Sequence, residues 1–162
     1  MGGRTNAPLI QLVTLSVWLG AAAFFSFALA PALFATLPSR TLAGAVVART
    51  LPILFIAGIA VGALVVWLQA ASGRAAIRDP RAICGCLIAA ACAVAQFVVG
   101  RRLDRLREDI GGPIEALPLD DARRVAFGRL HGISVAWLGL AMLAAALAIV
   151  VAWRVNNAAA NH

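Results

Sequence analysis

Four long stretches without a charged side chain dominate the sequence and limit what it can fold into. They run over residues 5–39, 50–73, 82–100 and 130–153, with His131 counted as neutral. A helix that crosses a bilayer needs about 20 mostly apolar residues, so each stretch is long enough for one crossing. Backbone polar groups find no water inside lipid, which leaves the α-helix for an open chain. We therefore predict an all-α integral membrane four-helix bundle that forms one domain over residues 1–162.

The composition agrees with lipid as the main solvent. Only 13% of the residues are charged and 62% are hydrophobic, whereas a soluble domain carries roughly 25% charged residues. The formal net charge of +7 comes from arginines at the span ends, where they meet anionic lipid headgroups, so we expect the bilayer as a partner and no nucleic acid. The predicted spans are about 8–30, 50–71, 82–100 and 131–153.

The first neutral stretch is longer than one straight span requires. Because a proline ring clashes with the carbonyl four residues earlier, Pro31 is expected to kink or end this helix near Ala30. Residues 31–38 then form a bent or interfacial continuation. Ala28-Leu29-Ala30 has the small residues of a signal-peptide cleavage site, but the apolar run is too long for one, and we expect no cleavage.

The segment 101–130 is the one sizeable polar piece, and it predicts an extramembrane helical hairpin between the third and fourth helices. Its apolar residues fall on one helical stripe: Leu103, Leu106 and Ile110. Gly111-Gly112-Pro113 should stop the first arm. Asp120 is the expected N-cap of the second arm. The fourth helix therefore begins well before it reaches lipid.

Arginine counts predict the orientation. Nine arginines flank the first and third loops, and five lie at the termini and the second loop, Arg4 and Arg74 among them. Since cytoplasmic loops are enriched in basic residues, both termini are expected in the periplasm. All 14 basic residues are arginine in a chain rich in Ala, Gly and Val, which is typical of GC-rich bacterial coding and indicates a bacterial inner membrane.

Polar residues at the mouth of the fourth span suggest a boundary site. His131 and Ser134 share the bundle-facing side of this helix, whereas Arg129 points away and anchors the helix in the headgroups. The first loop returns to the same membrane surface, so Arg40 and Arg49 are candidates for the same site. There, arginine would bind an anionic group and histidine would move a proton. The favoured interpretation is structural, with the arginines on lipid phosphates and His131 bonded to a loop carbonyl.

Metal and enzyme chemistry have little support. Cys84 and Cys86 diverge by about 200° on a helix and cannot grip one ion, and Cys92 lies two turns deeper. His131 is the one histidine within a span, so bis-histidine haem ligation inside one chain is not expected. We expect no metal, no cofactor and no enzymatic activity. Gly58 and Gly62 form a GxxxG pair that lets another helix approach closely.

Several of these features together resemble bacterial membrane proteins grouped with transmembrane protein 205, a domain-of-unknown-function family of four-helix proteins. The likeness spans nearly the whole chain and rests on these residues in order: Trp18, Gly20, Pro31, Phe34, Gly44, Arg49, Phe127, His131 and Ser134. The resemblance implies that Pro31, Phe34, Arg49, Phe127 and His131 matter to the family's fold or site. This sequence departs from the family at Trp137, where members often carry an asparagine.

The preferred function is that of a non-enzymatic accessory or scaffold protein that acts through helix packing. Gly58 and Gly62 would supply one contact face and the polar hairpin another. The expected partner is another membrane protein or further copies of the chain. The alternative is a small oligomeric transporter or ligand-binding protein that uses the Arg49–His131 boundary site.

Overall fold

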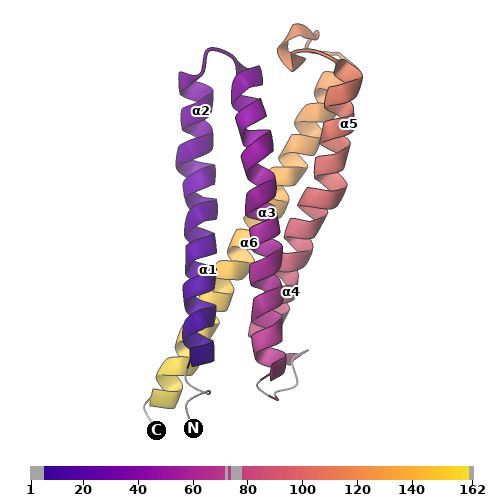
Figure 1. The fold of residues 1–162 in the computed structure, drawn as a ribbon. Helices are drawn as coiled ribbons and strands as arrows, with labels where there is room; N and C mark the ends of the chain where they lie inside the picture. Colours follow the sequence, from indigo (N-terminus) through magenta and orange to yellow (C-terminus); the bar gives the residue numbers. More distant parts are fainter. Residues whose placement is uncertain (1–5, 72, 74–77, 161–162) are drawn as a thin grey trace.

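Four long helical segments make up the computed structural model, which describes residues 6–71, 73 and 78–160 (Figure 1). Arg4 and Arg74, counted above for orientation, lie outside these residues. Each segment is long and apolar enough to cross a membrane, which confirms the all-α, four-span prediction. In chain order the elements are α1 (Asn6–Phe24), η1 (Phe25–Leu29), α2 (Ala30–Thr36), α3 (Arg40–Ala71), α4 (Pro80–Ala93), η3 (Val94–Gly100), α5 (Arg101–Ile110), η4 (Ile114–Ala116) and α6 (Ala122–Ala160).

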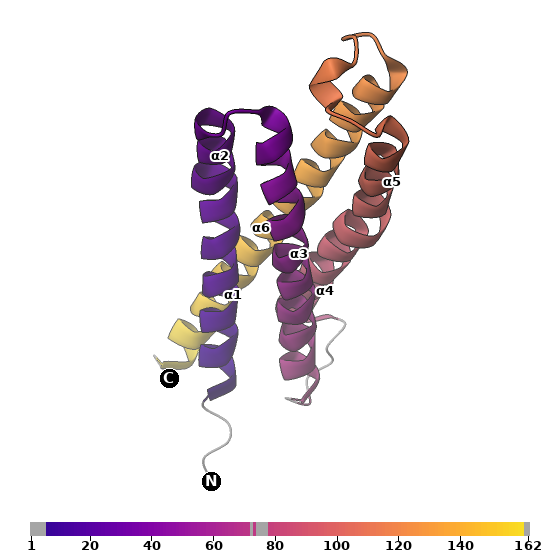
Figure 2. The ribbon, with the colours of Figure 1, turned by 45° about the horizontal axis from the view of Figure 1, so that its top comes forward.

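The segments α1, α3 and α4 stand side by side, and α6 crosses them diagonally (Figures 1 and 2). Both ends of the chain lie at one end of the bundle. The first loop and the polar hairpin lie together at the other end, as the sequence predicts. The helices reach past the predicted spans, since α3 already begins at Arg40 and α4 continues through η3 into α5.

Of the two outcomes expected at Pro31, a kink or an end of the helix near Ala30, the end does not occur. The helix continues to Thr36 through the five-residue π-helical turn η1. In this wide turn the Ala30 N–H donates to the carbonyl oxygen of Phe25, five residues back. The π turn shifts the carbonyls that precede Pro31 and so relieves the clash that a proline causes in a regular α-helix. The first span therefore continues past the proline as one long helix.

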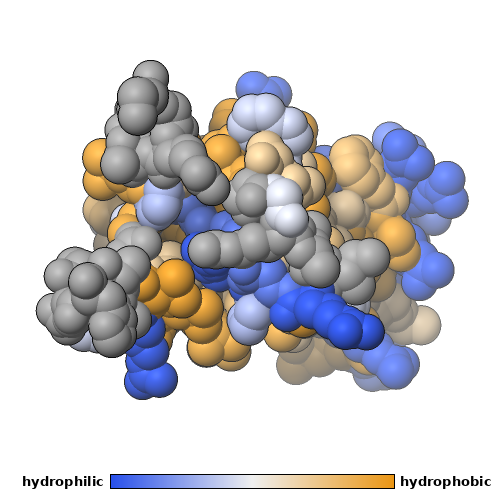
Figure 3. All heavy atoms as spheres, turned by 90° about the horizontal axis from the view of Figure 1, so that it is seen from below, coloured by the Kyte–Doolittle hydropathy of each residue, from blue (hydrophilic) through white to orange (hydrophobic). Residues whose placement is uncertain are grey.

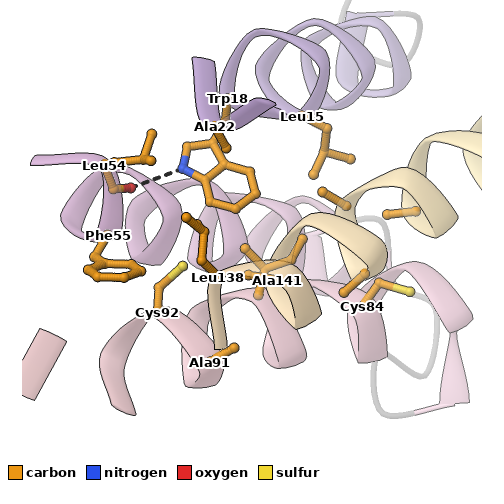
Figure 4. Packing of buried hydrophobic residues seen from close by; sticks show 14 of the residues in the cluster. Leu15, Trp18, Ala22, Leu54, Phe55, Cys84, Ala91, Cys92, Leu138 and Ala141 are labelled. Carbon is orange, nitrogen blue, oxygen red and sulfur yellow. Dashed lines mark hydrogen bonds between the residues drawn. The ribbon is translucent and has the colours of Figure 1, made fainter. Parts of the chain in front are cut away.

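The core lies between α1, α3 and α4 on one side and α6 on the other (Figure 4). Large side chains come from α1 and α3, among them Leu15, Trp18 and Phe55. The helix α6 contributes mainly small residues, and four of them recur at helical spacing with 0% exposure: Ala141, Ala145, Ala148 and Ala152. Small side chains let neighbouring helices approach closely, which is how packing is achieved where no water drives association.

The polar hairpin has the predicted form with one shift. The arm α5 ends at Gly111, whose φ of 64° is the left-handed conformation that favours glycine at this place. The second arm is capped by Asp121 and not by the predicted Asp120, because Asp121 Oδ1 accepts the Arg123 N–H at 2.8 Å. The hydrogen bonds from Arg123 hold the pKa of the Asp121 carboxyl below its usual range.

Candidate functional site

A small polar pocket of about 60 Å³ lies at the hairpin end of the bundle. Four elements enclose it: α3, η3, α5 and α6. Its polar side chains come from the last three of these elements and are Gln96, Asp104, Arg107, His131 and Ser134. The pocket is therefore assembled from segments that are distant in sequence, at the level where the helices leave the apolar part of the bundle.

His131 and Ser134 reach the pocket from successive turns of α6. Ser134 is 4% exposed, while His131 sits at the rim and is exposed on its outer side. Leu138 continues the same stripe into the core. This side of α6 faces the bundle as predicted, and Arg129 is exposed away from it.

Two backbone irregularities border the pocket. Ala95, Gln96 and Gly100 belong to the π-helical segment η3, and π turns inside α-helices are frequent at functional sites. On the opposite wall, Pro52 lies inside α3. Since proline has no N–H, it leaves the carbonyl of Ala48 without its usual helical donor, and both residues line the pocket. The polar side chains thus meet backbone that departs from a regular helix.

Arg107 supplies the positive charge at the pocket. Its guanidinium lies 2.8 Å from Asp104 Oδ1 and 5.3 Å from the centre of the Phe127 ring. These two contacts hold the guanidinium at the pocket edge. Arg101 makes a similar contact, 5.6 Å from the Phe97 ring centre, but does not line the pocket. The two arginines therefore share a contact with an aromatic ring but differ in two respects, since only Arg107 lines the pocket and only Arg107 has a salt bridge among the described residues.

The structure brings together only part of the predicted boundary site. His131 and Ser134 line one pocket, whereas Arg40 and Arg49 are exposed and do not line it. Arg107 takes the place that the sequence assigned to those arginines. The sequence did not single out Gln96 or Arg107, although a glutamine in an apolar span is itself a signal of a buried polar contact.

The two loops at this end are joined by Glu115 in η4. Its carboxylate accepts the backbone N–H of Thr41 at 3.2 Å and so caps the start of α3 from a distant loop. Hydrogen bonding from the Thr41 side chain, and then from backbone N–H groups, keeps the pKa of Glu115 below its usual range, with a smaller contribution from the nearby Arg40. The first and third loops therefore share one surface, which was the premise of the predicted site.

The glycines predicted to pack against another helix do so inside the bundle, against other helices of the same chain. A Cβ added at Gly62 would lie 2.5 Å from the carbonyl oxygen of Gly85 in α4, and one at Gly58 would lie 2.5 Å from Cys92 Sγ and 2.8 Å from the Trp18 ring. Both glycines are buried in the contact between α3 and its neighbours. They are consequently not available as an external contact face.

The other predicted packing residues lie in varied surroundings. Trp18 is 3% exposed, and its indole Nε1 donates to the carbonyl oxygen of Leu54 at 3.0 Å. Phe127 lies under Arg107. Gly20 has open space beside it, and Phe34 is 46% exposed. As helix geometry requires, Cys84 and Cys86 diverge: Cys84 is buried with Cys92, and Cys86 is exposed.

A second group of buried polar residues lies at the opposite end of the bundle, near the termini. Gln69 Nε2 donates to Gln11 Oε1 at 3.0 Å, and both side chains are at most 4% exposed. Arg81 pairs with Asp79 at 2.8 Å and is itself 5% exposed. Figure 3 shows hydrophilic atoms among the apolar helix surfaces at this end. The sequence analysis did not identify this group.

Comparison with known proteins places the chain in a family. Residues 13–111 match a domain of unknown function, DUF4149, over more than half of the chain. The chain belongs to the DUF4149 family. The match runs from α1 through α5, so the DUF4149 region includes Gln96 and Arg107, while His131 and Ser134 lie beyond it in α6. No curated protein and no solved structure matches the chain.

Proposed function

We propose that this multi-pass membrane protein binds a small anion in the polar pocket at its hairpin end. The observation that carries the proposal is the convergence of the donors of Arg107, Gln96, His131 and Ser134 on one pocket. Asp104 also lines the pocket and pairs with Arg107 at 2.8 Å, so an anion would bind through the remaining donors of the guanidinium. A guanidinium, an amide and a hydroxyl are all donors suited to an anion. His131 adds an imidazole, the side chain whose unperturbed pKa lies closest to neutral pH.

The size of the pocket limits the ligand. A volume of about 60 Å³ lies well below the roughly 300–1,000 Å³ of ordinary small-molecule sites. The pocket therefore suits an inorganic anion better than an organic metabolite. The described spans hold no acidic side chains apart from Asp104, Glu108 and Asp109 in the α5 arm. Transport through one chain therefore has little support, and transport would need an oligomer.

The test uses two arginine variants. In detergent, the thermal unfolding midpoint of the wild type should rise when chloride, nitrate or phosphate replaces gluconate, because a ligand that binds only the folded state stabilises it. Arg107→Gln should weaken the apparent affinity about tenfold or more, since a charge-assisted hydrogen bond contributes roughly 1.5–3 kcal/mol. His131→Gln should alter the pH dependence of binding.

Arg101→Gln is the matched control, because Arg101 also stacks on a phenylalanine but does not line the pocket. It should keep the response of the wild type. Equal losses in both arginine variants would mean that the anions act on surface charge, and a wild type that responds to none of the three anions would refute the proposal.

A second candidate is the accessory or scaffold role. The observation in its favour is Leu119, which is 79% exposed in the hairpin although it lies outside the long apolar helices. Leu119 is therefore accessible to a partner protein on the extramembrane side of the bundle. A photo-crosslinker placed at Leu119 in intact membranes should then yield one discrete protein adduct, and the absence of any adduct would remove this candidate.

We further propose that the protein lies in a bacterial inner membrane with both termini in the periplasm and that it is related to the transmembrane protein 205 group. The support is the excess of arginine at the hairpin end, nine against five, together with the order of motifs described above. An alkaline phosphatase fusion at the C-terminus should be active under this orientation. An inactive fusion beside an active one in the hairpin would reverse it.

A further inference from the structure

An open apolar groove of about 560 Å³ separates the first helical segment from α3. It runs from Val13 and Val61 at one end to Leu29 and Thr50 at the other. Both helices are membrane spans, so the groove opens sideways toward lipid. Its volume falls within the roughly 300–1,000 Å³ of ordinary small-molecule sites.

The groove offers nothing to a polar ligand. The two hydroxyl residues that line it are Thr14 and Thr50. Thr14 Oγ1 donates to the carbonyl oxygen of Ile10 at 2.8 Å, and Thr50 Oγ1 donates to that of Val46 at 2.9 Å. Both hydroxyls are thus occupied by their own helices. What remains is a hydrocarbon surface.

The shape of the groove excludes a closely packed helix. Its rims are large exposed side chains, Val17 at 67%, Phe24 at 63% and Ile53 at 68%, while Trp18 and Leu54 form a buried floor. Helices in lipid associate through small residues that let the backbones approach, and large rims keep a second helix away. A flexible acyl chain fits between the rims.

A π turn borders the groove. Phe25 and Leu29 belong to η1, the turn that accommodates Pro31, and both line the groove. The irregular backbone therefore lies where the first helical segment borders the groove near Thr50.

Arg49 lies directly beyond the Thr50 end. It is exposed, and none of the ion pairs or hydrogen bonds among the described residues includes its side chain. It is also the first charge before the neutral stretch 50–73, and arginines at the ends of apolar stretches are placed to meet lipid headgroups. Arginine matches phosphate geometry with paired hydrogen bonds.

We infer that the groove holds one acyl chain of an anionic phospholipid whose phosphate is bound by Arg49. This site is separate from the polar pocket, and Arg49, which does not line that pocket, has its role here. The inference goes beyond the proposed anion binding and does not depend on it.

The experiment is native mass spectrometry of the protein released from nanodiscs that contain phosphatidylglycerol and phosphatidylcholine in equal amounts. The wild type should retain one phosphatidylglycerol in preference to phosphatidylcholine. Arg49→Gln should lower this preference several-fold while a lipid is still retained. Ala57→Phe places an aromatic ring in the groove that Ala57 lines and should abolish retention of either lipid.

Two controls distinguish a specific lipid from the general lipid shell. Arg129→Gln removes another exposed arginine, and Ile56→Phe adds a ring on an exposed part of α3 outside the groove. Both should behave like the wild type. Equal loss in Arg49→Gln and Arg129→Gln would overturn the inference, as would a dimer that Ala57→Phe dissociates, since a second copy would then fill the groove. If Ala57→Phe does not fold, the comparison of the arginine variants still decides the matter.

Discussion

On one side α3 approaches α4 so closely that no Cβ fits between Gly62 and Gly85, whereas on the other side it meets α1 across an open groove. The close side is held by backbone contact along the glycines. The open side is held by two hydrogen bonds, from Trp18 to Leu54 in the groove floor and from Gln69 to Gln11 beyond its far end.

The difference shows how a helix inside lipid gains neighbours by two routes. Lipid tails are as apolar as leucine, so apolar side chains alone give little reason for helices to associate. On the α4 side the glycines carry no side chains, so the two backbones come close enough for dense dispersion contacts. On the α1 side the glycine Gly20 has open space beside it, and polar bonds hold the helices while room is left for a ligand.

The largest loss of stability is expected at Trp18, which forms part of the groove floor between α1 and α3. Trp18→Ala removes a 3%-exposed indole and its 3.0 Å hydrogen bond to Leu54. The free energy of unfolding in detergent should fall by about 3 kcal/mol or more, the cost of truncating a large buried aromatic residue. Trp67→Ala, at a residue that is 63% exposed, should change it by less than about 0.5 kcal/mol. Similar losses in both variants would mean that Trp18 does not hold α1 in place.

A smaller change in stability is expected where α3 packs closely against α4. In Gly62→Ala the new methyl group would meet the Gly85 carbonyl oxygen at 2.5 Å, so the two helices must separate, at a cost of about 1–3 kcal/mol. Gly44→Ala in the same helix meets nothing within 4 Å and should stabilise the helix by about 0.5–1 kcal/mol. Denaturant titrations of the two variants should therefore shift in opposite directions. A shift of the same sign in both would contradict the close contact between α3 and α4.

The four-helix architecture was predictable because it depends on where charged residues fall along the chain. Charge-free runs longer than a bilayer crossing fix the four helices, and Gly111 fixes the end of α5. The effect of Pro31 was not predictable from the residue alone. A proline breaks a regular helix, but five residues in a π turn remove the clash, and no local pattern distinguishes the two outcomes.

The candidate site was predictable only in part, because helix tilt decides which side chains converge. His131 and Ser134 follow from their spacing on α6, since one helical face must meet the bundle. That Arg107 and not Arg49 completes the pocket depends on how α5 leans against α6. The apolar groove has no sequence signature at all, since its lining residues are ordinary for a membrane span.

The smallest loss of stability is expected when the hydrogen bond between Gln11 and Gln69 is removed at Gln11. Gln11 Nε2 is buried without a hydrogen-bond partner among the described residues, so Gln11→Leu loses one hydrogen bond but also removes an unpaired buried amide. These terms oppose each other, and the free energy of unfolding should fall by less than about 1 kcal/mol. Gln69→Leu leaves Gln11 buried with neither end bonded to Gln69 and should cost more, about 1–3 kcal/mol. Equal losses in the two variants would show that the tie acts through its hydrogen bond alone. A larger loss in Gln11→Leu would contradict this prediction, since the loss of the Gln11 acceptor by the buried Gln69 amide would then be the more costly change.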